Sequence, residues 1–110
     1  MQKIIISDTS CLITLDKINQ LETLRSLFRT ITVSTIIAEE YGKSLPAFVE
    51  ILDPSQKVFQ QTLQLNVDAG EASAIALALQ YKDSLIIIDD FKARKIAEGL
   101  GLNITGTLGV

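Results

Sequence analysis

The amino-acid sequence predicts an α/β fold: a three-layer α/β/α sandwich with a central parallel sheet, formed as one domain over residues 1–110. Short, continuous apolar runs at residues 4–6 and 85–88 are typical of strands buried on both faces, as in a parallel sheet covered by helices. Between these runs, apolar residues recur at helical spacing, and such alternation favours parallel strands. A chain of 110 residues has room for one hydrophobic core.

Strands are expected where apolar and β-branched residues run together, at residues 4–7, 31–33, 85–88 and 102–105, with a minor strand at 51–52. Helical spacing predicts helices at residues 10–28, 35–41, 56–64, 68–79 and 90–99. Asn19 is expected to interrupt the first helix, Ser34 to cap the second, and Gly42 to end it. A further short segment is expected from Leu45, and residues 106–110 begin one more element.

The reactive side chains restrict the chemistry that the protein can perform. The chain has no histidine and one cysteine, which excludes histidine acid–base catalysis, Ser-His-Asp triads and histidine-bound zinc. Carboxylates then remain as the anionic metal ligands, and sites built only from oxygen favour Mg²⁺ or Mn²⁺. The cysteine, Cys11, falls within an apolar helical pattern and is expected to be a small core residue.

Net charge and hydropathy indicate which partners and which cellular location to expect. The net charge of −3 argues against a protein that coats DNA, but it does not exclude a nuclease, because bound cations reverse the local sign of an acidic cleft. The longest nearly apolar stretch, residues 74–79, is too short to cross a bilayer, so no membrane association is expected. A lone cysteine forms no internal disulfide, and the first strand begins without a signal peptide, so we expect a cytoplasmic protein.

Acidic side chains stand directly after two of the expected strands. Asp8 follows the first strand, and Asp89 and Asp90 follow the apolar run that ends at residue 88. Ligands of parallel α/β sheets bind just beyond the carboxyl ends of the strands. These carboxylates therefore suggest a metal site, and a metal site suggests phosphate chemistry.

Each acid also has a purely structural interpretation. Asp8 and Asp90 have the position of helix N-caps, which accept hydrogen bonds from free backbone N–H groups. Asp68 and Glu71 have the spacing of a capping box. Both interpretations remain open from the residues alone.

Glu40 is the acid that local periodicity explains least well. At about 100° per residue, the apolar face of its helix is centred between Ile36, Ile37 and Tyr41, and Glu40 lies roughly 40° from that centre. Glu39 lies about 140° away, on the outer side. Burying an unpaired charge is very costly. We therefore expect Glu40 to face inward and to have a cation as its partner.

The order of these motifs resembles that of the PIN-domain nucleases, in particular a VapC-like toxin branch. The matching segments are residues 5–10, 38–46, 68–72, 89–97 and 101–109, so the resemblance covers almost the whole chain. It implies a Mg²⁺- or Mn²⁺-dependent endoribonuclease that cleaves RNA phosphodiester bonds and leaves a 5′-phosphate. It further implies the toxin of a toxin–antitoxin pair, with RNA as substrate, a cognate antitoxin as partner and self-association as a dimer.

Carried over by position, the resemblance implies that the catalytic, metal-holding carboxylates are Asp8, Glu40, Glu71 and Asp90. Asp89 is a close neighbour that could substitute as a metal ligand. Substrate-binding roles, in orienting ligands or touching phosphates, are implied for Ser10, Thr107 and Arg94. Further phosphate contacts are possible for lysines that would otherwise be ordinary solvated charges: Lys43, Lys82, Lys92 and Lys95.

Two features depart from the family pattern. The region of the last strand has Asn103, Thr105 and Thr107 where a further acid is common, and the resemblance implies another helix and strand after Val110. We therefore expect a C-terminally shortened PIN-like domain. The alternative function is a catalytically inactive module that acts only in protein–protein interaction.

Two other phosphate-handling folds fit less well. A phosphoacceptor receiver domain needs paired acids after its first strand and a lysine after its last, whereas here Asp8 stands alone and residues 105–107 replace the lysine. A haloacid-dehalogenase-type phosphatase needs Asp-x-Asp after its first strand, but Ser10 occupies the place of the second acid.

Overall fold

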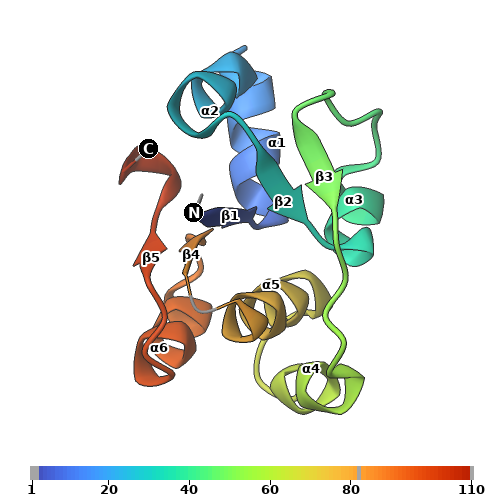
Figure 1. Cartoon of the computed structure of the whole chain (residues 1–110), viewed down its shortest axis with the longest axis vertical. Coiled ribbons are helices and arrows are strands. Elements are labelled where there is room, and N and C mark those ends of the chain that lie inside the picture. The colour runs from blue at the N-terminus through green and yellow to red at the C-terminus, as the bar shows by residue number, and fades with distance from the viewer. Residues whose placement is uncertain (1–2, 82, 110) are drawn as a thin grey trace.

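A five-stranded, entirely parallel sheet forms the centre of the molecule (Figure 1). The structure is a computed structural model that describes residues 3–81 and 83–109. The sheet has the strand order β3-β2-β1-β4-β5, with the bounds β1 Ile4–Ser7, β2 Ile31–Val33, β3 Val49–Ile51, β4 Ser84–Ile87 and β5 Ile104–Thr105. The predicted α/β fold with a central parallel sheet is confirmed.

Helices cover the two faces of this sheet. They are α1 Thr9–Lys17, α2 Leu21–Phe28, α3 Thr35–Tyr41, α4 Lys57–Leu63, α5 Ala69–Gln80 and α6 Phe91–Gly99, followed by the 3₁₀ turn η1 Thr107–Gly109. Figure 1 shows α1 and α2 on one side of the sheet and α4, α5 and α6 on the other. α3 packs against both α1 and α5, beside the carboxyl end of β2. The helices therefore form the two outer layers that the sequence predicts.

The expected elements occur with small shifts at their ends. The first helical segment is broken where expected, because Asn19 has a φ of 57° between α1 and α2. The segment from Leu45 forms neither helix nor strand. The minor strand lies at Val49–Ile51 and not at 51–52, because pairing with β2 sets its register, with Ile31 opposite Val49.

Burial differs between α5 and the end of α6. Residues 72–78 of α5 are all buried, so α5 is enclosed on more than one face. It packs against the sheet on one side and against α4 and α6 on others, and its small alanine and serine side chains allow this close approach. Leu100 follows α6 directly and is 41% exposed.

The core consists mainly of strand residues and of the helix residues that face them. Ile6, Ile86 and Ile87 are fully buried in the central strands, and Cys11 is fully buried as predicted.

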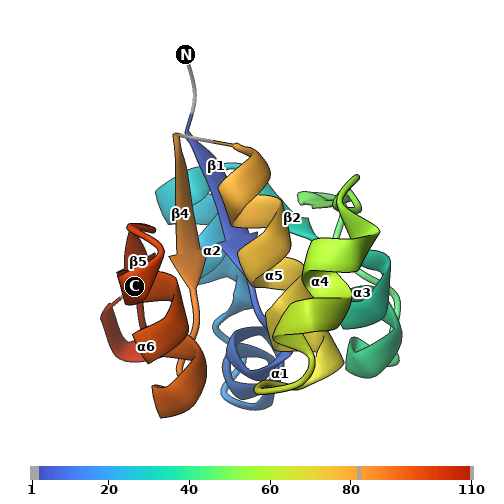
Figure 2. The same ribbon diagram turned by 90° about the horizontal axis from the view of Figure 1, so that it is seen from below.

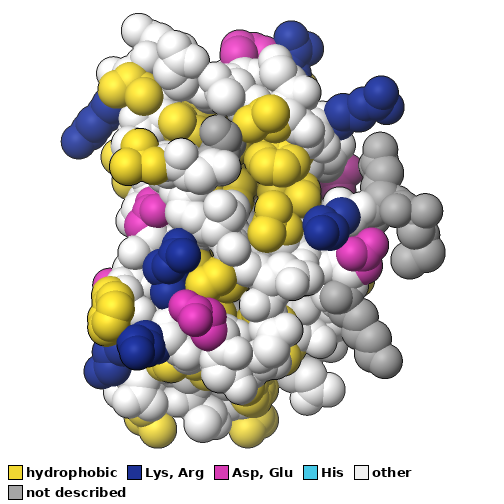
Figure 3. Space-filling model, turned by 90° about the vertical axis from the view of Figure 1, so that its left-hand side faces the viewer, with side chains coloured by type: hydrophobic (Ala, Val, Ile, Leu, Met, Phe, Trp, Pro, Cys, Tyr) yellow, Lys and Arg dark blue, Asp and Glu magenta, His cyan; other side chains and the backbone are white. Residues whose placement is uncertain are grey.

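Apolar side chains also reach the surface. Figure 3 shows hydrophobic groups gathered over the upper half of the face that carries β5 and α6. Among the described residues, no helix is both long enough and apolar enough to cross a membrane.

Candidate active site

The sheet has a switch point between β1 and β4. The chain passes from β1 to β2 and β3 on one side and then returns to β4 and β5 on the other. Such a change of direction opens a crevice at the carboxyl ends of the two strands, which is where α/β proteins bind ligands. Ser7 pairs with Ile87 at these ends. Asp8 and the pair formed by Asp89 and Asp90 therefore flank the switch point from adjacent strands.

Asp8 is held rigidly at the end of β1. Its backbone N–H donates to the carbonyl of Ile87 at 3.0 Å, and its Oδ1 accepts the backbone N–H of Cys11 at 3.0 Å. The residue is 2% exposed. Burial raises the pKa of the Asp8 carboxyl from 3.8 to about 6, repulsion from Asp89 and Asp68 acts in the same direction, and backbone N–H groups oppose both. Asp8 is thus a buried carboxylate whose negative charge is poorly compensated.

Three helices begin around Asp8, each capped by an acid. Asp8 caps α1, Asp90 caps α6 through the N–H of Ala93 at 2.9 Å, and Asp68 caps α5. Figure 2 shows the carboxyl edge of the sheet, where these helices begin. The cap interpretation of Asp8 and Asp90 is therefore confirmed. It does not exclude a second role, because each cap uses one carboxylate oxygen.

Glu71 completes a capping box with Asp68 and shares the same electrostatic neighbourhood. Its Oε1 accepts the N–H of Asp68 at 3.2 Å, while Asp68 Oδ1 accepts the N–H of Glu71 at 2.8 Å. The pKa of Glu71 is raised from 4.5 to about 7, mainly by partial burial and also by repulsion from Asp68, Asp90 and Asp8, while the backbone N–H of Asp68 opposes the rise. Four carboxylates from three segments therefore influence one another across the switch point.

Glu40 approaches the sequence neighbours of Asp8 and Glu71 from α3, although not as expected. The expectation that it faces inward is wrong, because the residue is exposed at the end of a short helix. Its carboxylate nevertheless turns toward the two neighbouring helices. Oε1 accepts the hydroxyl of Thr9, the residue after Asp8, at 2.6 Å, and the carboxylate lies against Gly70, the residue before Glu71.

Asp89 is bound differently from Asp90. Its Oδ1 accepts the backbone N–H of Thr107 at 2.8 Å, and its Oδ2 accepts the hydroxyl of the same residue. Arg94 donates from Nη1 to the carbonyl of Ile88 at 2.9 Å and lies close to Gly106. Thr107 and Arg94, both predicted to contact substrate, thus brace the segment that follows β4.

The acids of this cluster have no cationic partner among residues 3–81 and 83–109. The two ion pairs found there join Arg25 to Glu22 and Lys43 to Asp16, both at 2.6 Å. Within the same residues, no three acidic or sulfur ligands stand close enough to form a ready-made metal site. The donor set has the oxygen-only chemistry that suits Mg²⁺ or Mn²⁺, but binding such an ion requires side-chain adjustment.

The remaining predicted contacts are less clearly connected to the cluster. Ser10 is exposed and makes no side-chain hydrogen bond within the described part of the chain. Lys43 pairs with Asp16, Lys92 is exposed, and Lys95 lies 5.4 Å from the ring centre of Phe91. Lys82 and Val110 lie outside the described residues.

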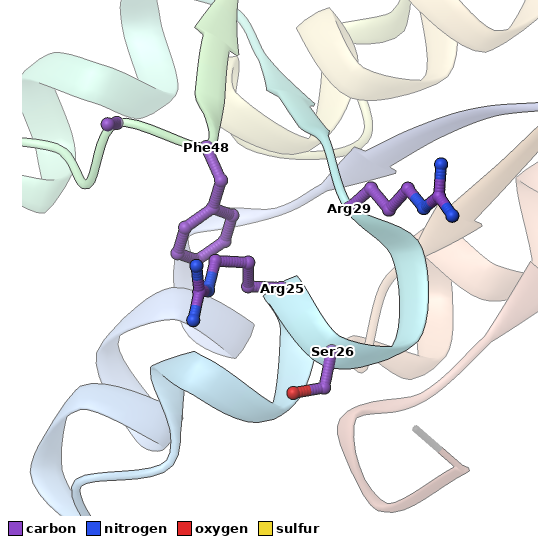
Figure 4. Close-up of a pocket in the computed structure, with 5 residues that line it drawn as sticks. Arg25, Ser26, Arg29 and Phe48 are labelled. Carbon is purple, nitrogen blue, oxygen red and sulfur yellow. The ribbon is translucent and has the colours of Figure 1, made fainter.

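A cavity of about 600 Å³ lies away from the acidic cluster, near the amino ends of β2 and β3. Its lining includes Arg25, Ser26, Arg29 and Phe48. In Figure 4 the Arg25 side chain lies beside the Phe48 ring, whereas the Arg29 guanidinium extends away from both. Because the two guanidinium groups do not converge, this cavity lacks the arrangement expected for a single bound anion.

Three contributors to the cluster could not be identified from the sequence. Thr9 and Gly70 both contact the Glu40 carboxylate, and Asp68, besides capping α5, raises the pKa of Asp8 and Glu71. A weak signal existed for each, since all three residues adjoin or share a motif with Asp8 or Glu71. Packing of α3 on both α1 and α5 brings Thr9 and Gly70 to Glu40.

These features define a class: a parallel α/β protein with strand order 3-2-1-4-5 and a carboxylate cluster at the switch point of its sheet. The chain belongs to the PIN domain family DUF3368, which matches residues 4–110. PIN domains have a nuclease-type fold and typically use divalent metals. A search of curated proteins found no match.

Proposed function

We propose that this protein is a metal-dependent endoribonuclease that hydrolyses RNA phosphodiester bonds at the carboxyl edge of β1 and β4. The observation that carries this proposal is the gathering of Asp8, Glu71 and Asp90 at the carboxyl edge of β1 and β4, where burial and mutual repulsion raise the pKa of Asp8 to about 6 and that of Glu71 to about 7. Acids that repel one another at a functional crevice, without a cationic partner among the described residues, favour uptake of a cation.

Asp8, Glu71 and Asp90 would hold the cation, with Glu40 beside them. Each has its side chain anchored by a backbone or hydroxyl donor through one oxygen. That anchoring limits the side-chain adjustment that binding of an ion requires, which reduces the cost of ordering the donors. When bound, a divalent ion supplies activation of water for attack on phosphorus and stabilisation of the charge that develops there.

Arg94 and Thr107 support the segment that carries Asp89 and Asp90. Thr107 holds Asp89, and Arg94 holds the carbonyl of Ile88, so the segment between β4 and α6 keeps its conformation. Asp90 begins α6 directly after this segment. We assign Arg94 and Thr107 to support of Asp90 as well as to the substrate contacts expected of them.

The test is to replace Asp8 and Asp90 separately by Asn and to measure Mn²⁺-dependent cleavage of single-stranded RNA. Asn is as good an N-cap as Asp, so the helices should persist while the charge is lost. Both variants should lose at least about 100-fold in cleavage rate, because stabilisation by a metal is worth several kcal/mol. The matched control is Asp83→Asn, which removes an exposed carboxylate just before β4, at the opposite edge of the sheet.

Unchanged cleavage by both variants would refute the catalytic assignment. Cleavage that is absent in the wild type, together with no thermal stabilisation by Mn²⁺, would instead favour the inactive interaction module. The roles in a toxin–antitoxin pair and in a dimer belong to the same proposal. Growth upon expression, with and without the adjacent gene, tests the first, and the molar mass in solution tests the second.

A further inference from the structure

The Glu40 carboxylate occupies space that any side chain at position 70 would take. A Cβ built on Gly70 would lie 3.1 Å from Cδ of Glu40 and 3.4 Å from Oε2, and it would overlap Oε1. Gly70 is inside α5 and its φ is not positive, so its backbone does not require glycine. Glycine within a helix is less favourable than alanine. The missing side chain therefore has a steric purpose, which is to leave room for this carboxylate.

A hydroxyl fixes the same carboxylate from the opposite side. Thr9 Oγ1 donates to Glu40 Oε1 at 2.6 Å, a short hydrogen bond to a charged acceptor. Thr9 is the first residue of α1 and follows Asp8 directly. The position of Glu40 is thus tied to the element that Asp8 caps, whereas Oε2 has no part in this bond.

The amino end of α5 adds an electrostatic attraction. Gly70 is the second residue of this helix of 12 residues, and free N–H groups at a helix start favour a nearby negative charge. Two buried hydroxyls hold α3 on α5: Ser34 and Ser73 are 2.7 Å apart, and Ser73 donates to the carbonyl of Gly70 at 2.7 Å. The two helices are therefore aligned where Glu40 meets Gly70.

We propose that Gly70 and Thr9, the sequence neighbours of Glu71 and Asp8, are positioning residues that hold the Glu40 carboxylate between the starts of α1 and α5 for binding of a divalent cation. This inference rests on the proposed function for the role of the cation, but the contacts of Glu40 with Gly70 and Thr9 are present in the metal-free protein. Gly70 supplies the space and Thr9 supplies the hydrogen bond. A side chain at position 70 displaces the carboxylate without disturbing the fold.

The test compares Gly70→Ala with Gly99→Ala, a matched control. Gly99 also lies in a helix without a positive φ, and a Cβ there meets nothing within 4 Å. Mn²⁺ affinity is measured by calorimetry, and the ¹³C shift of the Glu40 carboxyl carbon is followed by NMR in the metal-free protein. Gly70→Ala should weaken Mn²⁺ binding about 10- to 100-fold, as loss of supporting groups typically does, and should move the Glu40 signal. Gly99→Ala should do neither.

Thr9 is tested by replacement with Val and with Ser. Thr9→Val should weaken Mn²⁺ binding and move the Glu40 signal, whereas Thr9→Ser keeps the hydroxyl and should restore both. A double variant, Gly70→Ala with Glu40→Gln, should bind Mn²⁺ no more weakly than Glu40→Gln alone, because Gly70 acts through Glu40. Melting temperatures of the metal-free variants should stay at or above the wild-type value for Gly70→Ala.

The outcomes separate this inference from the proposed function. If the Glu40 signal does not move in Gly70→Ala, Gly70 does not position the Glu40 carboxylate, whatever the Mn²⁺ affinity of the variant. If the signal moves but the Mn²⁺ affinity is unchanged, the position of the Glu40 carboxylate has no role in metal binding. Wild-type protein that takes up no Mn²⁺ refutes the proposed function and the metal role together, and in that case the NMR comparison alone still decides whether Gly70 and Thr9 hold Glu40.

Discussion

Thr107 donates both its backbone N–H and its hydroxyl to the carboxylate of Asp89, with the N–H to Oδ1 distance at 2.8 Å. These two hydrogen bonds join η1, the last described element, to the segment that follows β4. It also occupies both oxygens of Asp89. The relationship bears on stability and on the choice of metal ligand.

Removal of the Thr107 hydroxyl should loosen the end of the chain. Thr107→Val abolishes one of the two hydrogen bonds, and we expect the free energy of unfolding to fall by about 1 kcal/mol, the usual net value of such a bond. Urea denaturation measures the change. Thr107→Ser keeps the hydroxyl and should behave like the wild type, and equal losses in both variants would contradict a role for this hydrogen bond.

Asp89 and Asp90 should differ as metal ligands. Both Asp89 oxygens are taken by Thr107, whereas the cap of α6 uses one oxygen of Asp90. We therefore expect Asp90→Asn to weaken Mn²⁺ binding by at least about tenfold more than Asp89→Asn does, since a ligand generally contributes more than its supporting groups. Calorimetric titration of the two variants makes the comparison. The reverse order would assign the ligand to Asp89.

Burial of Asp8 should make the metal-free protein less stable as pH rises. The unfolded chain releases the Asp8 proton near pH 3.8, whereas the folded protein holds it to about pH 6. Between these values the folded state binds more protons, so its stability falls with rising pH and stays lower above pH 6. Asp8→Asn keeps the cap without the charge, and above pH 6 it should exceed the wild type by up to about 3 kcal/mol.

Denaturant unfolding of both proteins from pH 4 to pH 8 measures this difference. The gap should be small at the acid end and should widen through the interval between the two pKa values. A variant less stable than the wild type at every pH would show that the Asp8 carboxylate contributes more as a cap than its burial costs. Asp83→Asn, which changes an exposed acid, serves as the control.

Metal affinity should show the opposite dependence on pH. A cation competes with the protons that Asp8 and Glu71 retain up to about pH 6 and about pH 7. Mn²⁺ binding should therefore strengthen from pH 5 to pH 8, by up to about tenfold per pH unit for each proton displaced. Calorimetry in buffers of different ionisation enthalpy counts the protons released. Glu71→Gln should flatten the upper part of this dependence, and an unchanged profile would remove Glu71 from the site.

Much of the fold could be predicted because its signals are local. The apolar run before Asp8 and the one before Asp89 are dictated by burial on both faces of the sheet, and both form strands within one residue of the expected ends. Asn19, Ser34 and Gly42 act through their own backbone or side chain, and each interrupts, caps or ends a helix where expected. The bounds of the edge strand β3 could not be predicted, because pairing with β2 sets its register and its own residues do not.

The sequence by itself determined which groups are available: carboxylates without histidine, placed after strands, in an order that marks the PIN domain family. It could not determine which of these groups meet, since the raised pKa values of Asp8 and Glu71 arise from burial and from charges far along the chain. Only the tertiary structure placed Glu40 at the surface against Gly70, because the packing of α3 on α5 outweighs the helix periodicity that predicted an inward side chain. The sequence thus determines which carboxylates are present, and the packing of the helices determines which residues they contact.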